Sequence, residues 1–381
     1  MALDHDDLAE LTAWRHALHQ RPDLSGEEEA TARAVESFLA PTGPDRLLKD
    51  LGGHGLAAIY NGVESGPTVM LRAELDALPI HEIGDAPYRS QTDGKGHLCG
   101  HDGHMAILAG VARELARRRP GQGRVVLLFQ PAEETGAGAA AVLTDPRFAE
   151  IAPDYAFALH NLPGLPLGEV ALKDGPVNCA SRGLRVDLSG RTAHASMPET
   201  GRSPMAAVAH LMPALTGLGV GGTLSDDFAL VTVTHAVMGE PCFGVAPGHA
   251  EIWATLRTMR DARMSPLVET AEWVTRHLAE TNGLDWSVSY HDVFRHCEND
   301  PDAVGHLRGA LDAVGVPHKP GEPMRASEDF GRFRDVAKTA MLFLGAGTDH
   351  PSLHNPDYDF PDALIPVGAR IFERVVRDLL G

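Results

Sequence analysis

The sequence predicts an α/β protein in which helices flank a mostly parallel sheet and a smaller α+β domain is inserted into the chain. Between residues 66 and 160, short and almost continuously apolar strands alternate with helices, which is typical of a parallel sheet buried on both faces. Between about 182 and 290, the strands alternate apolar and polar residues, as half-exposed antiparallel strands do. A length of 381 residues also favours two domains over a single core.

The elements of the first domain follow in order along residues 1–181. Apolar residues at helical spacing, among them Leu8, Leu11 and Leu18, predict helices over the first ~40 residues, with a break between Pro22 and Gly26. Further strands are expected at 68–73, 124–130 and 155–160, and further helices at 104–118 and from 136 onward.

The inserted domain is expected over residues 182–291. Strands are predicted at 184–188 and 230–235, and helices at 204–218 and 265–281, which describes a small sheet with two helices on one face. The α/β pattern returns in residues 292–381 with a strand at 340–345. Residues 1–181 and 292–381 are therefore expected to form one domain.

The charge of the chain excludes several classes of partner. The formal net charge is −19, from 33 basic and 52 acidic residues, which repels nucleic acids and anionic membranes, so that neither is an expected partner.

No apolar segment approaches the roughly 20 residues that span a bilayer, and the N-terminus does not resemble a secretory signal. The 4 cysteines are scattered, which favours reduced thiols and a cytoplasmic protein.

Side chains that bind metals follow the predicted strands. In open α/β sheets, ligands bind at the carboxyl ends of the strands, and His, Cys or paired carboxylates lie in the segments 72–79, 96–104, 130–135, 160–161 and 345–355. The candidate residues are Asp76, Cys99, His101, Glu133, Glu134, His160 and His354.

Each of these signals is weak alone, because a Cys-x-His pair, two acidic residues or one histidine usually has a structural or solvated role. Their conjunction favours a metal site. Thiolate, imidazole and carboxylate together suit Zn²⁺, or else Mn²⁺, Co²⁺ or Ni²⁺, better than Mg²⁺ or Ca²⁺. The candidates exceed the needs of one tetrahedral site, which predicts two ions about 3.5–4 Å apart. Of the adjacent Glu133 and Glu134, one could bind metal while the other acts as general base; the spacing leaves open which.

Several motifs together resemble a known family. Arg72-Ala-Glu-Leu-Asp-Ala-Leu-Pro, His97-Leu-Cys-Gly-His-Asp-Gly-His, Gln130-Pro-Ala-Glu-Glu, Gly190-Arg-Thr-Ala-His-Ala-Ser, Ser327-Glu-Asp-Phe and His354-Asn-Pro-Asp-Tyr-Asp-Phe are similar to those of the aminoacylase/carboxypeptidase family of dinuclear metallopeptidases. They most resemble its amidohydrolase subgroup, which includes hippurate hydrolases, auxin-conjugate hydrolases and N-acetyldiaminopimelate deacetylases. The resemblance runs from about Leu11 to the C-terminus and implies a zinc-peptidase-like fold with a lid and dimerisation domain, and hence a homodimer.

The resemblance also implies roles for single residues. The implied metal ligands are Cys99, His101, Glu134, His160 and His354. Glu133 becomes the general base, and Asp76 a carboxylate that supports the ligands. His194 matches a histidine that reaches the neighbouring subunit's site and stabilises the tetrahedral oxyanion.

The residues for substrate recognition match the family less completely. Arg257 matches an arginine that binds the substrate carboxylate, and Asn161 is a further candidate. Gly244 stands where relatives usually have an asparagine, and Glu74 where they usually have an aspartate.

The expected activity is hydrolysis of a small N-acyl-L-amino acid to a carboxylate and a free amino acid. A dipeptidase or carboxypeptidase on the same scaffold is the close alternative, because the amide attack is the same. A non-catalytic metal-binding relative is the distant alternative, but Glu133 and every ligand position are present.

Overall fold

A computed structural model describes residues 3–381, and the chain divides into two compact units. The larger unit extends to Val177 and also contains Glu298–Glu322 and Asp329–Gly381. The inserted unit contains Asn178–Cys297 and Pro323–Glu328. The sequence-based boundaries at 182 and 291 fall a few residues inside the inserted unit, and the roles expected for the two domains remain predictions.

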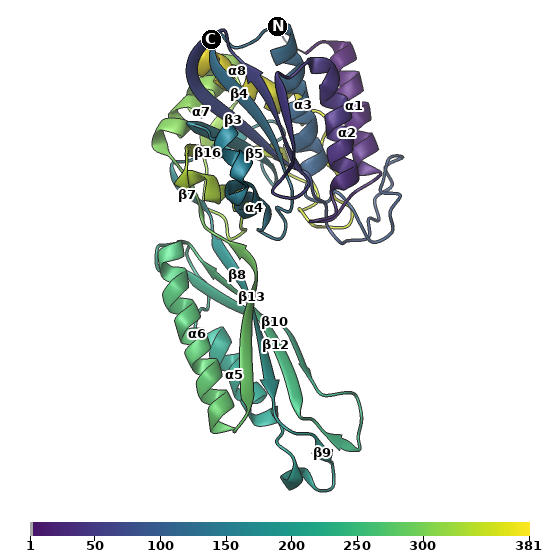
Figure 1. The fold of residues 1–381 in the computed structure, drawn as a ribbon, viewed down its shortest axis with the longest axis vertical. Helices are drawn as coiled ribbons and strands as arrows, with labels where there is room; N and C mark the ends of the chain where they lie inside the picture. The colour runs from purple at the N-terminus through teal and green to yellow at the C-terminus, as the bar shows by residue number, and fades with distance from the viewer. Residues whose placement is uncertain (1–2) are drawn as a thin grey trace. The chain divides into compact units, whose positions relative to one another are not determined.

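The larger unit is built on a sheet of order β1-β2-β4-β3-β5-β16-β6-β15 (Figure 1). The neighbours β4, β3, β5 and β16 run parallel, whereas β1, β2 and β6 add antiparallel pairings toward the edges. The strands are β1 (Arg46–Leu51), β2 (Gly55–Asn61), β3 (Glu64–Glu74), β4 (Gln122–Gln130), β5 (Tyr155–Pro163), β6 (Val170–Leu172), β15 (His318–Pro320) and β16 (Lys338–Gly347). The mostly parallel α/β class predicted from the sequence is confirmed.

Successive residues of a strand point to opposite faces of the sheet, so a strand of buried residues needs helices on both faces. Val69, Leu71 and Ala73 of β3 join the core formed with α3 and α8, whereas Arg72 faces the short helix η4. The helices of the unit are α1 (His5–His19), α2 (Glu29–Leu39), α3 (His101–Arg117), α4 (Gly138–Thr144), α7 (Pro301–Val314) and α8 (Leu364–Leu380), with the 3-10 helices η1 (Ala40–Thr42), η2 (Pro146–Glu150) and η4 (Asp329–Asp335). The core therefore lies on both sides of the parallel strands.

Helix α3 begins earlier than the sequence pattern predicts. The expected start at residue 104 is wrong by three residues, because the helix begins at His101 directly after Gly100. Gly100 has a φ of 92°, and an added Cβ would collide with the side-chain amide of Asn161. The glycine thus permits the turn that places His101 and His104 in the first turn of the helix.

The inserted unit has a four-stranded antiparallel sheet of order β10-β12-β8-β13, with α5 and α6 packed together on it (Figure 1). Its elements are β8 (Ala180–Ser189), β9 (Ala193–His194), η3 (Pro198–Thr200), α5 (Met205–Gly217), β10 (Ala229–Met238), β11 (Val245–Ala246), β12 (His249–Thr258), α6 (Asp261–Thr281) and β13 (Asp285–Phe294). The chain passes between the units near β7 (Gly175–Asn178) and β14 (Cys297–Asn299). None of the helices in residues 3–381 has the length and apolar character that crossing a membrane requires.

Candidate metal centre

The carboxyl ends of the parallel strands bring the predicted ligands together. Asp76 follows the end of β3, Glu133 and Glu134 follow β4, and His160 lies near the end of β5. His354 lies in the loop after β16. Because these strands run parallel, their ends share one edge of the sheet, and Cys99, just before α3, and His101, its first residue, lie at the same edge.

The ligand atoms form overlapping groups in which all atoms lie within 4.8 Å of one another. These groups are Cys99 with His101 and His160, Cys99 with Glu134 and His354, and His101 with Glu133 and Glu134. The shared members make the groups one continuous cluster. Cys99, His101 and Glu133 are buried, whereas His354 is exposed.

The imidazoles of His101 and His160 present the same nitrogen, Nε2, to the cluster. His101 Nδ1 lies 2.8 Å from the backbone oxygen of Asp76, and His160 Nδ1 lies 2.8 Å from that of Asn161. A carbonyl can only accept, so each Nδ1 donates, and each Nε2 is left as the metal-binding atom of the neutral ring. His160 Nε2 lies 3.4 Å from Cys99 Sγ. His101 Nε2 is buried and has no hydrogen-bond partner among the described residues.

Asp76 forms hydrogen bonds that hold neighbouring residues of the cluster in position. Its Oδ2 accepts hydrogen bonds from Ser25 Oγ at 2.7 Å and from the backbone N–H of Glu134 at 2.9 Å. Its carbonyl orients His101. Asp76 therefore fixes one imidazole and the backbone of one carboxylate residue.

The electrostatics of the cluster suit a cation. Burial lowers the pKa of His101, but Glu74, Asp76 and Glu134 outweigh this and raise it to about 10. Burial lowers the pKa of His160 to about 3, so its ring is neutral, as metal binding requires. Burial and the carboxylates of Glu134 and Glu133 raise the pKa of the Cys99 thiol well above its ordinary value. A thiolate in this position needs a positive charge beside it.

Backbone strain occurs at two positions next to the cluster. Ala132, which precedes Glu133, has a φ of 48°, and His354 has a φ of 66°. Residues with a Cβ adopt this left-handed region at a cost, and such strain is concentrated at functional sites. Hydrogen bonds hold both residues, from Ala132 N to Glu28 Oε1 and from His354 N to Leu98 O, each at 2.8 Å.

A buried polar network that the sequence analysis did not identify lies beneath the cluster. Glu74 forms an ion pair with Arg72 and contacts His104 Nδ1 at 2.6 Å. His104 Nε2 lies 2.6 Å from Asn161 Oδ1, and Asn161 Nδ2 donates to the Tyr358 hydroxyl at 2.5 Å. Both ends of the Asn161 amide are thus used inside the unit, and its expected role in substrate binding remains a prediction.

The remaining predicted residues lie in the inserted unit. His194 of β9 pairs with Val245 of β11, and Gly244 O accepts from the N–H of Ala195 at 3.0 Å, so His194 and Gly244 share one small ribbon. Ser196 N donates to His194 Nδ1 at 3.1 Å, which places the proton of the neutral ring on Nε2. Arg257 lies apart from this ribbon, on β12.

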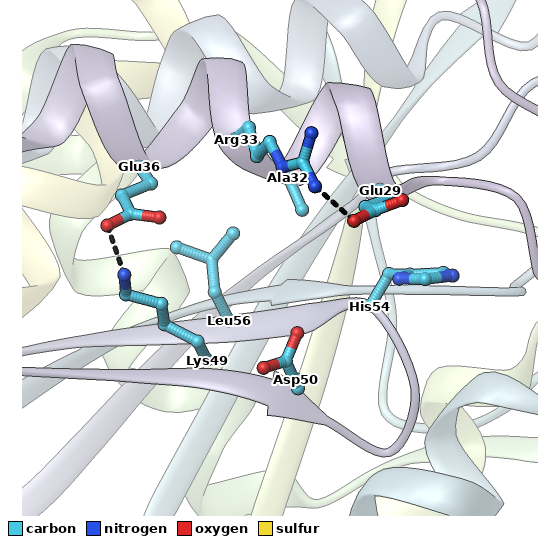
Figure 2. Close-up of a pocket in the computed structure, with 8 residues that line it drawn as sticks. All are labelled: Glu29, Ala32, Arg33, Glu36, Lys49, Asp50, His54 and Leu56. Atoms are coloured by element: carbon cyan, nitrogen blue, oxygen red, sulfur yellow. Dashed lines mark hydrogen bonds and ion pairs between the residues drawn. The ribbon is translucent and has the colours of Figure 1, made fainter.

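A polar hollow of the larger unit lies between α2 and the hairpin of β1 and β2, away from the cluster (Figure 2). Figure 2 shows that ion pairs between its own lining residues, Glu29 with Arg33 and Glu36 with Lys49, use most of its charges. It contains none of the predicted site residues. Its composition therefore gives no reason to place the chemistry there.

The residues of the cluster fit a divalent metal centre. Thiol, imidazole and carboxylate atoms converge, the buried Nε2 of His101 has no hydrogen-bond partner in residues 3–381, and the other ring nitrogens are fixed by carbonyl groups. Burial and the neighbouring carboxylates raise the pKa of the Cys99 thiol, and a bound cation would act in the opposite direction.

Comparisons with known proteins agree with this geometry. The family model described as peptidase family M20/M25/M40 matches residues 70–378. The chain is 32% identical to N-acetyl-L-cysteine deacetylase of Bacillus subtilis, covering 97% of this chain and 88% of the relative. It is 30% identical to hippurate hydrolase of Campylobacter jejuni, covering 95% and 94%. The structure of the Bacillus subtilis YXEP protein, a dinuclear metal binding peptidase, superposes with a TM-score of 0.82 at 26% identity, covering 99% of each chain.

Replacing Cys99 tests the metal centre without an activity assay. A ligand that binds only the folded protein stabilises it, by about 2.7 kcal/mol at a hundred times its Kd. We expect Zn²⁺ to raise the thermal unfolding temperature of the chelator-treated protein, and Cys99→Ser to reduce this rise. The control is Cys242→Ser, which changes an exposed thiol of the inserted unit. An equal zinc-dependent rise in Cys99→Ser and in the unaltered protein would argue against Cys99 as a ligand.

Proposed function

We propose that this chain, which belongs to peptidase family M20/M25/M40, hydrolyses the amide bond of an N-acyl-L-amino acid to a carboxylate and a free amino acid. The observation that carries the proposal is the convergence of six side chains in overlapping groups, namely Cys99, His101, Glu133, Glu134, His160 and His354. The substrates named for the two curated relatives, N-acetyl-L-cysteine and hippurate, are both N-acyl amino acids, which supports this class. The enzyme is thus an amidohydrolase that acts on linear amides.

The positions of the two adjacent glutamates support a division of roles. Glu134 groups with Cys99 and His354 on one side and with His101 on the other, and its Oε2 lies 3.7 Å from His354 Nε2. Glu133 groups with His101 and Glu134, where its Oε2 lies 3.9 Å from His101 Nε2. We therefore assign Glu134 to the ligands and Glu133 to proton transfer.

The chemistry then follows from general acid–base catalysis. Two divalent ions, Zn²⁺ or Mn²⁺ with Co²⁺ or Ni²⁺ as further candidates, would polarise the scissile carbonyl and lower the pKa of water in the site. Glu133 accepts the proton of the attacking water at a carboxylate oxygen and passes it to the leaving amide nitrogen. Asp76 keeps His101 and the Glu134 backbone in position during these transfers.

Residues of the inserted unit complete the proposal. His194 Nε2 carries the proton of the neutral ring and can donate it in a hydrogen bond to the oxyanion of the tetrahedral intermediate. We assign this role to His194 of the neighbouring subunit in a homodimer formed through the inserted unit. Exposed apolar side chains of that unit, such as Trp253 and Val237, support a contact there.

Substrate recognition is assigned to the guanidinium of Arg257, which would pair with the α-carboxylate. Gly244 leaves open space where an added Cβ would meet no atom within 4 Å, so this edge can accept a larger group.

The compartment that we propose is the cytoplasm, supported by the absence of a disulfide among residues 3–381.

Glu133→Gln tests the mechanism directly. General acid–base catalysis contributes a factor of about a thousand, so we expect turnover of N-acetyl and N-benzoyl amino acids to fall by that order while the metal content stays unchanged. The measurements are hydrolysis rates and elemental analysis. The control is Glu269→Gln, an exposed glutamate of α6. Activity that survives Glu133→Gln contradicts the mechanism, and faster cleavage of dipeptides than of N-acyl amino acids contradicts the substrate class.

Mixed dimers test the role of His194. Glu133→Ala and His194→Ala should each be inactive alone. If His194 acts across a two-fold dimer, half of the dimers after random mixing are heterodimers with one intact site each, so about a quarter of the activity returns. The assay is turnover after the two variants are unfolded together and refolded. Mixed samples as inactive as the separate variants contradict a shared site.

A further inference from the structure

Two arginine residues of the inserted unit, Arg257 and Arg325, are in direct contact. Arg257 of β12 donates from Nη1 to the backbone oxygen of Arg325 at 3.0 Å and to Ser327 Oγ at 2.9 Å. Arg325 donates from Nη2 to the backbone oxygen of Gly222 at 3.0 Å. All of these residues belong to the inserted unit, so this arrangement does not depend on the placement of the other unit.

Neither guanidinium has a carboxylate partner within residues 3–381; their hydrogen bonds go to neutral oxygens. Other arginines of the unit do form ion pairs, Arg185 with Asp187 and Arg260 with Asp226. In a chain with a net charge of −19, these two neighbouring arginines thus have no carboxylate beside them among the described residues. A partly buried cation left without a counter-charge is costly, which favours a bound anion.

The buried thiol of Cys179 lies near both positive charges. Burial raises the pKa of this thiol to about 11, and the nearby positive charges of Arg257 and Arg325 both act in the opposite direction. A thiol with this pKa stays neutral near pH 7, so Cys179 does not supply the missing negative charge. Burial also lowers the pKa of Arg257 itself.

Arg325 is held in position without being enclosed. Its guanidinium carbon lies 5.7 Å from the centroid of the Phe228 ring, and that ring is only 3% exposed. The contact with Phe228 and the hydrogen bond to Gly222 O orient the group, whereas the residue as a whole is exposed. A planar, oriented guanidinium with unused N–H groups suits the bidentate binding of a carboxylate.

We propose that Arg325 is a specificity-determining residue that binds a second carboxylate of the substrate, so that the enzyme prefers N-acyl derivatives of dicarboxylic amino acids such as glutamate and aspartate. The inference rests on the proposed function, in which Arg257 takes the α-carboxylate. A substrate with one carboxylate leaves one of the two positive charges uncompensated, whereas a dicarboxylic substrate balances both. Ser327 Oγ, bonded to Arg257, lies at the same site as a further polar group.

Binding to a Glu133→Gln protein tests the inference without turnover. N-acetyl-L-glutamate and N-acetyl-L-glutamine have nearly the same size and differ by one negative charge, so calorimetric titration of the metal-loaded protein with each isolates the effect of that charge. A charge-assisted pair predicts about tenfold tighter binding of the glutamate compound. Adding Arg325→Met should remove this preference and leave the affinity for the glutamine compound unchanged, because the methionine stem still covers Phe228.

Two further variants complete the design. Arg325→Lys keeps the charge and should keep part of the preference, and Arg276→Met removes an exposed arginine of α6 and should change neither affinity. Equal affinity for both compounds before Arg325 is changed, including no measurable binding of either, overturns the inference. An equal loss for both compounds in Arg325→Met also overturns it, since that result describes a structural role. Failure of the proposed function would give a different result. The unaltered enzyme would then hydrolyse no N-acyl amino acid, while the glutamate compound would still bind more tightly than the glutamine compound.

Discussion

Burying charge in a protein is costly unless the charge is paired, and the larger unit buries Glu74, Asp76 and Glu133 close to the partly exposed Glu134. Positive charges and hydrogen-bond donors lie close to some of these carboxylates and not to others. Glu74 has Arg72 and His104, and Asp76 has the Ser25 hydroxyl and a backbone N–H. The outer carboxylates instead face His101 and the Cys99 thiol. Divalent cations bound at that position would supply the positive charge that the site requires.

The parallel sheet makes this concentration of charge possible. Its strands are apolar over most of their length, so polar groups collect where the strands end. Rigid strands and the first turn of α3 then hold the ligand atoms. Beneath the cluster, the contacts from Glu74 through His104 and Asn161 to Tyr358 fix the positions of the loops that carry the ligands. The larger unit thus organises the proposed chemistry, while the inserted unit carries the residues proposed for recognition.

Much of the site could be predicted because its signals are local in sequence. Ligand-type residues directly after apolar strands indicated which edge of the sheet to examine, and the structure brings Cys99, His101, Glu133 and His160 together there. The start of α3 was placed too late, because Gly100 adopts a left-handed conformation directly before His101, and the side chain of Asn161 that excludes a Cβ there is distant in sequence. Ser25 reaches Asp76 across 51 residues of sequence, and no pattern around it indicates this contact. Arg325 was missed for a similar reason, since its proximity to Arg257 exists only after folding.

The central claim is that the cluster binds two divalent ions, and anomalous diffraction from crystals of the zinc-loaded protein tests it most directly. The account predicts two anomalous peaks about 3.5–4 Å apart, within bonding distance of Cys99 Sγ, His101 Nε2 and the Glu134 carboxylate. Zinc peaks only at other positions, with none within bonding distance of these three residues, would contradict it.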